Sequence, residues 1–232
     1  MKIVVTHLTR MMKGYICVAG VDPDTLRHVR PVLEGRRLKS FSLDSRGGPF
    51  GMAAEVDLGP VRACGSPPEV EDVEFNPACA RRLRTLAAGE FWALLEQIVA
   101  PDLRTAFGDD LRPTGGTCTV EVSQGIASLA CLAPARPPLL AIDHVDRVRA
   151  RIADPHATYD LPVTDLRFYE PPDYQQAREY LVEDFNTRAA AGARVLAGLG
   201  LTRPFAAREG EPERHWLQVN ALYLQDPRLS KP

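Results

Sequence analysis

The sequence predicts a mainly β protein of the α+β class, and three observations lead to this prediction. Short apolar segments alternate with polar residues at the strand period in both halves of the chain. Turns rich in Gly, Pro and Asp separate these segments. Each half also holds one longer segment with apolar residues at helical spacing. A helix before the last of five strands is the order of a small OB-type barrel, so we expect two such barrels in tandem.

The first half is expected to form the first OB-like domain, over residues 1–124. Its strands are predicted at 2–7, 14–20, 25–32 and 52–58. Residues 34–51, rich in Arg, Lys, Ser and Gly, are expected to be an inserted loop without a core of its own. A helix is predicted at 76–99, with Asn76 as N-cap and Pro77 at the first helical position.

The second OB-like domain is expected over residues 125–232. A strand is predicted just before this domain, at 117–122. Within the domain, strands are predicted at 126–132, 144–153, 157–165 and 215–224. The helix of this domain is predicted at 172–198, where Gly192 and Gly198 weaken the end. The final strand alternates regularly between polar and apolar residues.

Composition restricts the class of protein. The chain of 232 residues is 45% hydrophobic and 25% charged, which is typical of a folded globular protein. Its five cysteines show no zinc-ligand spacing, so neither a metal nor another cofactor is expected. No charged leader with an apolar run and no long apolar stretch is present, and a cytoplasmic location is expected. Neither a Gly-rich phosphate loop with its lysine nor a nucleophile elbow occurs.

Positive charge is concentrated at the front of the chain. Residues 1–46 contain nine Lys or Arg and four Asp or Glu, although the formal net charge of the whole protein is −2. A second group, Arg147, Arg149 and Arg151, is expected on one outward strand face because the residues are two apart. A localised cationic face is typical of proteins that bind phosphate or another acidic partner. Ordinary surface arginines would produce the same pattern.

OB barrels that bind nucleic acid combine basic side chains with aromatic platforms for the bases. Aromatic residues make up only 7% of this chain, and Tyr15, His28, Phe41 and Tyr159 are the available candidates. The predicted nucleic-acid-binding residues are Arg10, Lys13, Arg27, His28, Arg30, Arg36, Arg37, Arg147, Arg149, Arg151, Tyr15 and Tyr159. No catalytic residue is predicted, and Cys17, between two apolar residues, is expected to be a small buried hydrophobe.

Several segments, in this order, carry a resemblance to a known family. They are Gly14-Tyr15-Ile16-Cys17-Val18-Ala19-Gly20, Arg30-Pro31-Val32, Tyr159-Asp160-Leu161-Pro162-Val163-Thr164-Asp165, Leu199-Gly200-Leu201-Thr202-Arg203-Pro204-Phe205 and His215-Trp216. With them the chain resembles the dual OB-containing domain family, bacterial proteins expected to act in conflict or defence systems. The resemblance implies two OB folds and the binding of nucleic acid or a nucleotide-like ligand. It implies no catalytic residues, and His28 stands where the family pattern has a large aromatic residue.

Two alternative functions are open at this point. An adaptor would dock its sheet edges and helices on a partner protein, with the arginines facing acidic surfaces, and would expose an apolar patch rimmed by charge. A metal-dependent phosphoesterase would use Glu55 and Asp57 from one strand face together with Asp165. Alternating charge on an exposed strand would explain Glu55 and Asp57 equally.

Overall fold

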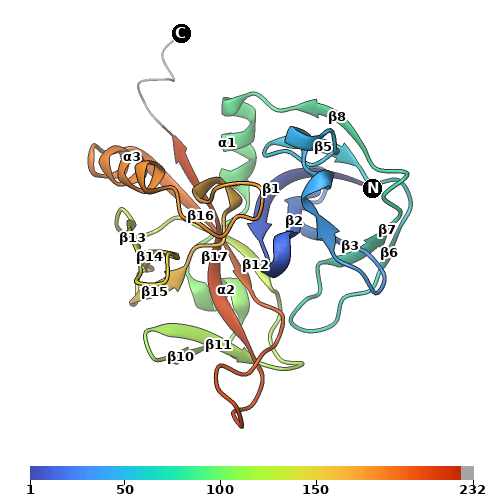
Figure 1. Cartoon of the computed structure of the whole chain (residues 1–232). Helices are drawn as coiled ribbons and strands as arrows, with labels where there is room; N and C mark the ends of the chain where they lie inside the picture. Colours follow the sequence, from blue (N-terminus) through green and yellow to red (C-terminus); the bar gives the residue numbers. More distant parts are fainter. Residues whose placement is uncertain (226–232) are drawn as a thin grey trace.

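The computed structural model describes residues 1–225, which form three β-sheets and three α-helices (Figure 1). The mainly β, α+β architecture expected from the strand periodicity is therefore confirmed. In Figure 1 the long C-terminal strand β17 (Arg214–Gln225) runs down the middle of the molecule, with the first sheet on the right and the third on the left. Over the described residues, no helix is long and apolar enough to cross a membrane.

The first sheet contains the N-terminal strands in the order β6-β7-β3-β2-β1-β5-β8, with β4 paired to β2. Their bounds are β1 (Lys2–Arg10), β2 (Tyr15–Val21), β3 (His28–Val32), β4 (Leu38–Lys39), β5 (Ala54–Asp57), β6 (Val61–Ala63), β7 (Asp72–Phe75) and β8 (Arg81–Thr85). Strand β1 is buried along almost its whole length, because β2 and β5 pair with its two edges and the rest of the protein covers its faces. It carries a register shift between Val5 and His7.

The second sheet has the order β10-β11-β17-β16-β12-β9, and the third has the order β13-β14-β15. The strands of the second sheet besides β17 are β9 (Val99–Ala100), β10 (Arg112–Thr114), β11 (Thr117–Glu121), β12 (Leu129–Leu132) and β16 (Arg194–Leu201). Those of the third are β13 (Leu139–Ile142), β14 (Val148–Ala153) and β15 (Thr158–Pro162). The helices are α1 (Ala88–Gln97), α2 (Leu103–Phe107) and α3 (Glu179–Ala190).

The predicted helix at 76–99 is wrong in its first half. Arg81–Thr85 forms β8, an exposed edge strand, and α1 begins only at Ala88. Antiparallel pairing with β5 sets Arg84 opposite Glu55 and Arg81 opposite Asp57, and both pairs form ion pairs. Cross-strand pairs of opposite charge favour a strand here, although the same residues have good helix propensity.

The predicted helix at 172–198 is also too long. Helix α3 ends at Ala190, Gly192 has a left-handed φ of 89°, and Arg194–Leu201 is strand β16. Strand β16 pairs with β17 over its entire length. Gly198 and Gly200 disfavour helix. Gly198 also allows His7 of β1 to pack closely against β16, since a Cβ at Gly198 would lie 2.4 Å from Nε2 of His7.

The segment 34–51 is not a loop without a core contribution. It contains β4 and two short 3₁₀ turns, η2 (Ser40–Ser42) and η3 (Asp44–Arg46), and its Leu38, Leu43 and Phe50 are buried. The predicted strands at 25–32 and 144–153 begin later, at His28 and Val148, because tight turns precede them. The short strands β6, β7, β9, β10 and β13 have no counterpart in the sequence prediction.

One hydrophobic cluster joins the two halves of the chain. It extends from Ile3 on β1 to Leu222 on β17 and includes residues of the third sheet and of α3. An acidic segment also connects the halves: the Glu71 carboxylate accepts hydrogen bonds from the backbone N–H groups of Ser128 and Leu129 and from the Ser128 hydroxyl. The division of the chain into domains 1–124 and 125–232 stays a prediction.

Candidate ligand-binding cleft and cationic trough

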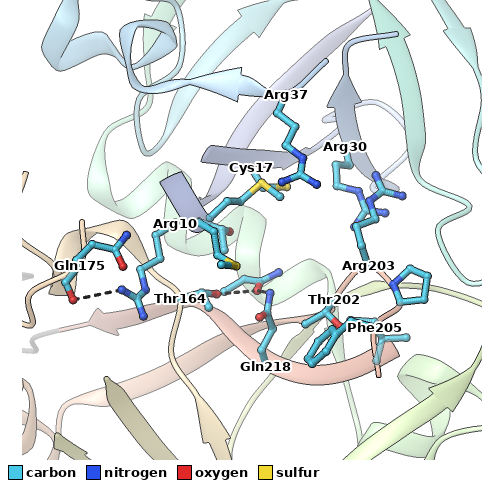
Figure 2. Close-up of a pocket in the computed structure, with 16 residues that line it drawn as sticks. Arg10, Cys17, Arg30, Arg37, Thr164, Gln175, Thr202, Arg203, Phe205 and Gln218 are labelled. Carbon is cyan, nitrogen blue, oxygen red and sulfur yellow. Dashed lines mark hydrogen bonds between the residues drawn. The ribbon is translucent and has the colours of Figure 1, made fainter. Parts of the chain in front are cut away.

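A cleft of about 460 Å³ lies where the end of β1 meets the middle of β17. Figure 2 shows basic side chains from both halves of the chain around it. We call this site the cleft. Its lining residues are Thr9, Arg10, Met11, Met12, Cys17, Arg30, Arg37, Thr164, Gln175, Leu201, Thr202, Arg203, Pro204, Phe205, Gln218 and Asn220.

Arg10 is fixed at one end of the cleft. Its backbone N–H donates to the Thr164 carbonyl at 2.8 Å, which extends β1 toward the segment after β15. Its Nη1 donates to the carbonyl oxygen of Tyr174 at 2.8 Å, and the guanidinium lies 3.9 Å from the centre of the Tyr169 ring. None of the residues 1–225 offers a carboxylate to this guanidinium. Its positive charge is therefore held in position and is not neutralised.

Arg30 and Arg203 lie at the other end and share one carboxylate. Arg30 Nε is 2.5 Å from Oδ1 of Asp72, and Arg203 Nη2 is 2.5 Å from Oδ2 of the same residue. Glu69 also pairs with Arg203, at 3.2 Å. The two arginines are thus matched by two carboxylates and add little net charge to the cleft. The Nη2 atom of Arg30 is buried and has no hydrogen-bond partner in the described chain.

Polar side chains of β17 line the cleft between these two ends. Gln218 donates from Nε2 to Oδ1 of Asn220 at 2.8 Å, and Thr164 donates from Oγ1 to the same oxygen at 3.2 Å. Asn220 occupies the space beside Gly200, where a Cβ would lie 2.0 Å from its Nδ2. These two amides are therefore held in one arrangement by their neighbours.

An apolar wall completes the cleft. Phe205 is 47% exposed and leans on Trp216, with ring centres 5.8 Å apart. The indole N–H of Trp216 donates to the Phe205 carbonyl at 3.1 Å, which fixes the loop after β16. Cys17 lies in the cleft, as Figure 2 shows, and burial raises the pKa of its thiol. A thiol with a raised pKa is a poor nucleophile.

A second pocket, of about 670 Å³, adjoins the cleft and shares Met12 and Arg37 with it. We call it the cationic trough. Its lining residues are Met12, Lys13, Tyr15, Gly35, Arg36, Arg37 and Lys39. Pairing of β2 with β4 sets Tyr15 opposite Lys39, and the Arg37 guanidinium lies 5.9 Å from the Tyr15 ring centre. Within residues 1–225, none of the four basic side chains forms an ion pair with a carboxylate.

Half of the predicted binding residues meet at these two adjoining pockets. They are Arg10, Lys13, Tyr15, Arg30, Arg36 and Arg37. Arg27 is exposed in the turn before β3 and lines neither pocket. His28 packs edge-on against the buried His7 with ring centres 6.0 Å apart, and burial lowers the pKa of His28 to about 4. His28 is therefore half-buried and meets another ring edge-on, so it is no open stacking platform.

The arginines of the third sheet do not join the cleft. Arg147 pairs with Asp143 at 2.9 Å, and Arg149 pairs with Asp160 at 3.1 Å. Arg149 and Arg151 line a separate pocket of about 260 Å³ together with these aspartates. Arg149 and Arg151 do lie on the outward face of β14, where they alternate with the buried Ala150 and Ile152. Carboxylates of neighbouring turns and strands nevertheless neutralise part of this charge.

Tyr159 lies at a further pocket, with Cys118, Asp154 and His156. Burial raises the pKa of its hydroxyl to about 12. The second half therefore contributes to the cleft through residues that the sequence interpretation missed, namely Thr164, Gln175, Thr202, Arg203, Phe205, Gln218 and Asn220. One sequence signal could have found two of them. Gln218 and Asn220 are polar residues two apart in the middle of the final strand, between apolar neighbours.

The carboxylates of the phosphoesterase alternative do not come together. Glu55 pairs with Arg84 and Asp57 with Arg81 across β5 and β8, whereas the fully buried Asp165 pairs with Arg167. Across the described part of the chain, no group of three or more His, Cys, Asp or Glu side chains could hold a metal ion.

Comparison with known proteins gives only distant structural likenesses. No protein-family model matches the chain, and no curated protein matches it in sequence. One similar solved structure is the HINb domain of p204, with 9% sequence identity, a TM-score of 0.36, and coverage of 94% of this chain and 95% of that chain. A second is the HINa domain of Ifi202 in complex with 20-base-pair double-stranded DNA, with 8% identity, a TM-score of 0.34, and coverage of 97% of this chain and 94% of that chain. A third is a murine DNA-binding protein bound to double-stranded DNA, with 10% identity, a TM-score of 0.33, and coverage of 100% of this chain and 97% of that chain.

Proposed function

We propose that this protein is a non-catalytic tandem OB-like protein that binds nucleic acid or a nucleotide-like ligand. The ligand would lie along the cationic trough and enter the cleft. The resemblance to the dual OB-containing domain family further suggests a recognition role in a bacterial defence system.

The observation that carries this proposal is a set of unmatched positive charges at two adjoining pockets. These charges belong to Arg10, Lys13, Arg36, Arg37 and Lys39, none of which pairs with a carboxylate in residues 1–225. The protein as a whole has a net charge of −2, so this local excess is not a consequence of a basic composition. Uncompensated arginines and lysines around an open groove favour a polyanionic ligand over a neutral one.

Salt dependence is the direct test. Fluorescence polarisation would be measured with labelled single-stranded DNA, single-stranded RNA and double-stranded DNA over a range of salt concentrations. Because phosphate contacts release counterions, five contacts to a single strand predict a slope of about −3.5 for log K against log salt. If none of the three probes shows salt-dependent binding, this proposal is wrong and the adaptor alternative is favoured.

A pair of matched variants locates the binding surface. Lys13→Ser with Arg36→Ser removes two charges from the cationic trough, and Arg147→Ser with Arg151→Ser removes two exposed charges from the third sheet. The first double variant is expected to weaken binding and to make the slope shallower by about 1–2. The second is expected to leave both unchanged, and equal effects of the two would contradict the assignment to the trough.

A further inference from the structure

We propose that the cleft holds a single nucleotide unit, with its phosphate between Arg10 and Arg37 and its base against Phe205. This inference rests on the proposed function. It adds the size of the bound unit and a separate role for each of the two pockets. The cationic trough would follow the phosphate backbone, and the cleft would take one base.

The dimensions of the cleft agree with a small unit. Its volume of about 460 Å³ lies in the range of small-molecule sites, roughly 300–1,000 Å³. Residues of β1, β2, β3, β16 and β17 and of the segments that connect the strands line it, so a base would enter as an unpaired unit. Met12 and Arg37 connect it to the trough, which gives the rest of a strand a path out.

The phosphate is placed by charge. Arg10 and Arg37 are the two arginines of the cleft without a carboxylate partner among the described residues, whereas Arg30 and Arg203 are matched by Asp72 and Glu69. Arg10 is held by the Tyr174 carbonyl and the Tyr169 ring, so little side-chain entropy is lost when it binds. A second, independent observation is the buried Nη2 of Arg30, which lacks an acceptor. An unpaired buried donor in a lining residue points to a ligand oxygen.

The base is placed by Phe205. Its ring is exposed at the cleft, and Trp216 and the indole hydrogen bond support it from behind. A supported, half-exposed aromatic ring is the kind of platform on which unpaired bases stack. In Figure 2, Phe205 lies next to Gln218 and on the opposite side of the cleft from Arg37, which leaves the interior of the cleft between platform and charge.

The amides of β17 could contact the edge of the base. Gln218 uses Nε2 and Asn220 uses Oδ1 in their mutual hydrogen bond. Within residues 1–225, this leaves Oε1 of Gln218 as an acceptor and Nδ2 of Asn220 as a donor. One acceptor and one donor side by side match the pattern that a base edge presents. Gly200 makes this arrangement possible, because a side chain there would displace Asn220.

The test is a competition experiment with the full-length protein. The labelled single-stranded oligonucleotide is displaced with AMP, CMP, GMP and UMP, and with adenosine and inorganic phosphate as the separated parts. We expect at least one nucleoside monophosphate to compete, and each separated part to compete at least about tenfold more weakly. The proposal that the cleft holds a single nucleotide would be overturned if the oligonucleotide binds with the expected salt dependence and no monophosphate displaces it.

Four variants separate the roles of the two pockets. Phe205→Ala is expected to weaken monophosphate binding about tenfold, since one stacking contact is lost. Phe205→Tyr should retain the affinity, and Phe41→Ala, which removes a 66% exposed phenylalanine outside the cleft, should leave it unchanged. The trough variant with Lys13→Ser and Arg36→Ser should keep monophosphate binding while it loses affinity for the oligonucleotide. Equal losses for Phe205→Ala and Phe41→Ala would overturn the placement of the base.

Two results distinguish the failure of this inference from that of the proposed function. Loss of all oligonucleotide binding rejects the proposed function, whereas retained oligonucleotide binding that is insensitive to Phe205→Ala rejects only the nucleotide site. The relative affinities also identify the source of the unit. Tighter binding of the oligonucleotide assigns the unit to a strand, and tighter binding of the monophosphate assigns it to a free nucleotide.

Discussion

Arg30 on β3 and Asp72 on β7 form a buried ion pair between two parallel neighbouring strands, with Nε and Oδ1 2.5 Å apart. The two side chains are only 5% and 7% exposed. Arg203, from the loop after β16, binds the second oxygen of the same carboxylate. Asp72 therefore connects the first sheet to the second and fixes one end of the cleft.

We expect Asp72→Ala to destabilise the fold strongly. The substitution would leave the buried Arg30 without its carboxylate, and an uncompensated buried charge costs about 3–5 kcal/mol. Urea unfolding followed by circular dichroism measures this loss. Asp109→Ala serves as the control, because Asp109 and its partner Arg104 are both exposed, and about 1 kcal/mol or less is expected. Similar losses in the two variants would show that Asp72 has no special structural role.

Glu71 joins the halves of the chain through its carboxylate, which accepts three hydrogen bonds from Ser128 and Leu129. We expect Glu71→Ala to lower the free energy of unfolding by at least about 2 kcal/mol, because two buried N–H groups would lose their acceptor. Ser128→Ala removes one donor only and is expected to cost about 1 kcal/mol. Urea midpoints of the two variants provide the comparison, and a larger loss for Ser128→Ala would contradict this account.

Two histidines, the buried His7 and the half-buried His28, predict how stability depends on pH. Burial lowers the pKa of His7 to about 3 and that of His28 to about 4, so both are neutral in the folded protein at pH 5. The unfolded chain binds these protons below its ordinary pKa of about 6.5, and stability therefore falls as the pH falls. Well below that value the two groups together give a slope of about 2.7 kcal/mol per pH unit, and stability is fully present above pH 7.

The measurement is the free energy of unfolding in urea between pH 7.5 and pH 5, above the range in which most carboxylates titrate. His28→Leu is expected to reduce the slope by about half, to about 1.4 kcal/mol per pH unit. His144→Gln should leave it unchanged, since His144 is exposed in the turn before β14. A flat profile over this range would show that the two rings take up protons in the folded state.

Two glycines predict opposite effects of the same substitution. A Cβ at Gly20 on β2 would lie 2.4 Å from the Val4 carbonyl oxygen, a backbone atom in a buried strand that cannot move away. Gly20→Ala is therefore expected to destabilise the protein by about 1–3 kcal/mol. Gly89 in α1 has open space at its Cβ, and Gly89→Ala is expected to stabilise by about 0.5–1 kcal/mol. Thermal unfolding of both variants checks the two signs.

Local patterns in the sequence were sufficient for the mainly β class and for most of the long strands. The apolar residues within 2–7 correspond to β1, which is buried on both faces, and the alternation over 215–224 corresponds to β17. The excess of basic residues in 1–46 corresponds to the cationic trough, where η1 (Met12–Gly14) and the hairpin-like approach of β2 and β4 gather residues close in sequence.

Tertiary pairing decided the rest. Arg81–Thr85 and the start of Arg194–Leu201 have residues that suit a helix, and they are strands because β5 and β17 supply their hydrogen-bond partners. The cleft needs Arg10 and Arg37 from the first half beside Phe205 and Gln218 from the second. No periodicity encodes which residues from distant parts of the chain line the same cleft. The same limit applies to charge at Arg30, because Asp72 approaches it only in the folded chain, whereas Arg147 pairs with the sequence neighbour Asp143.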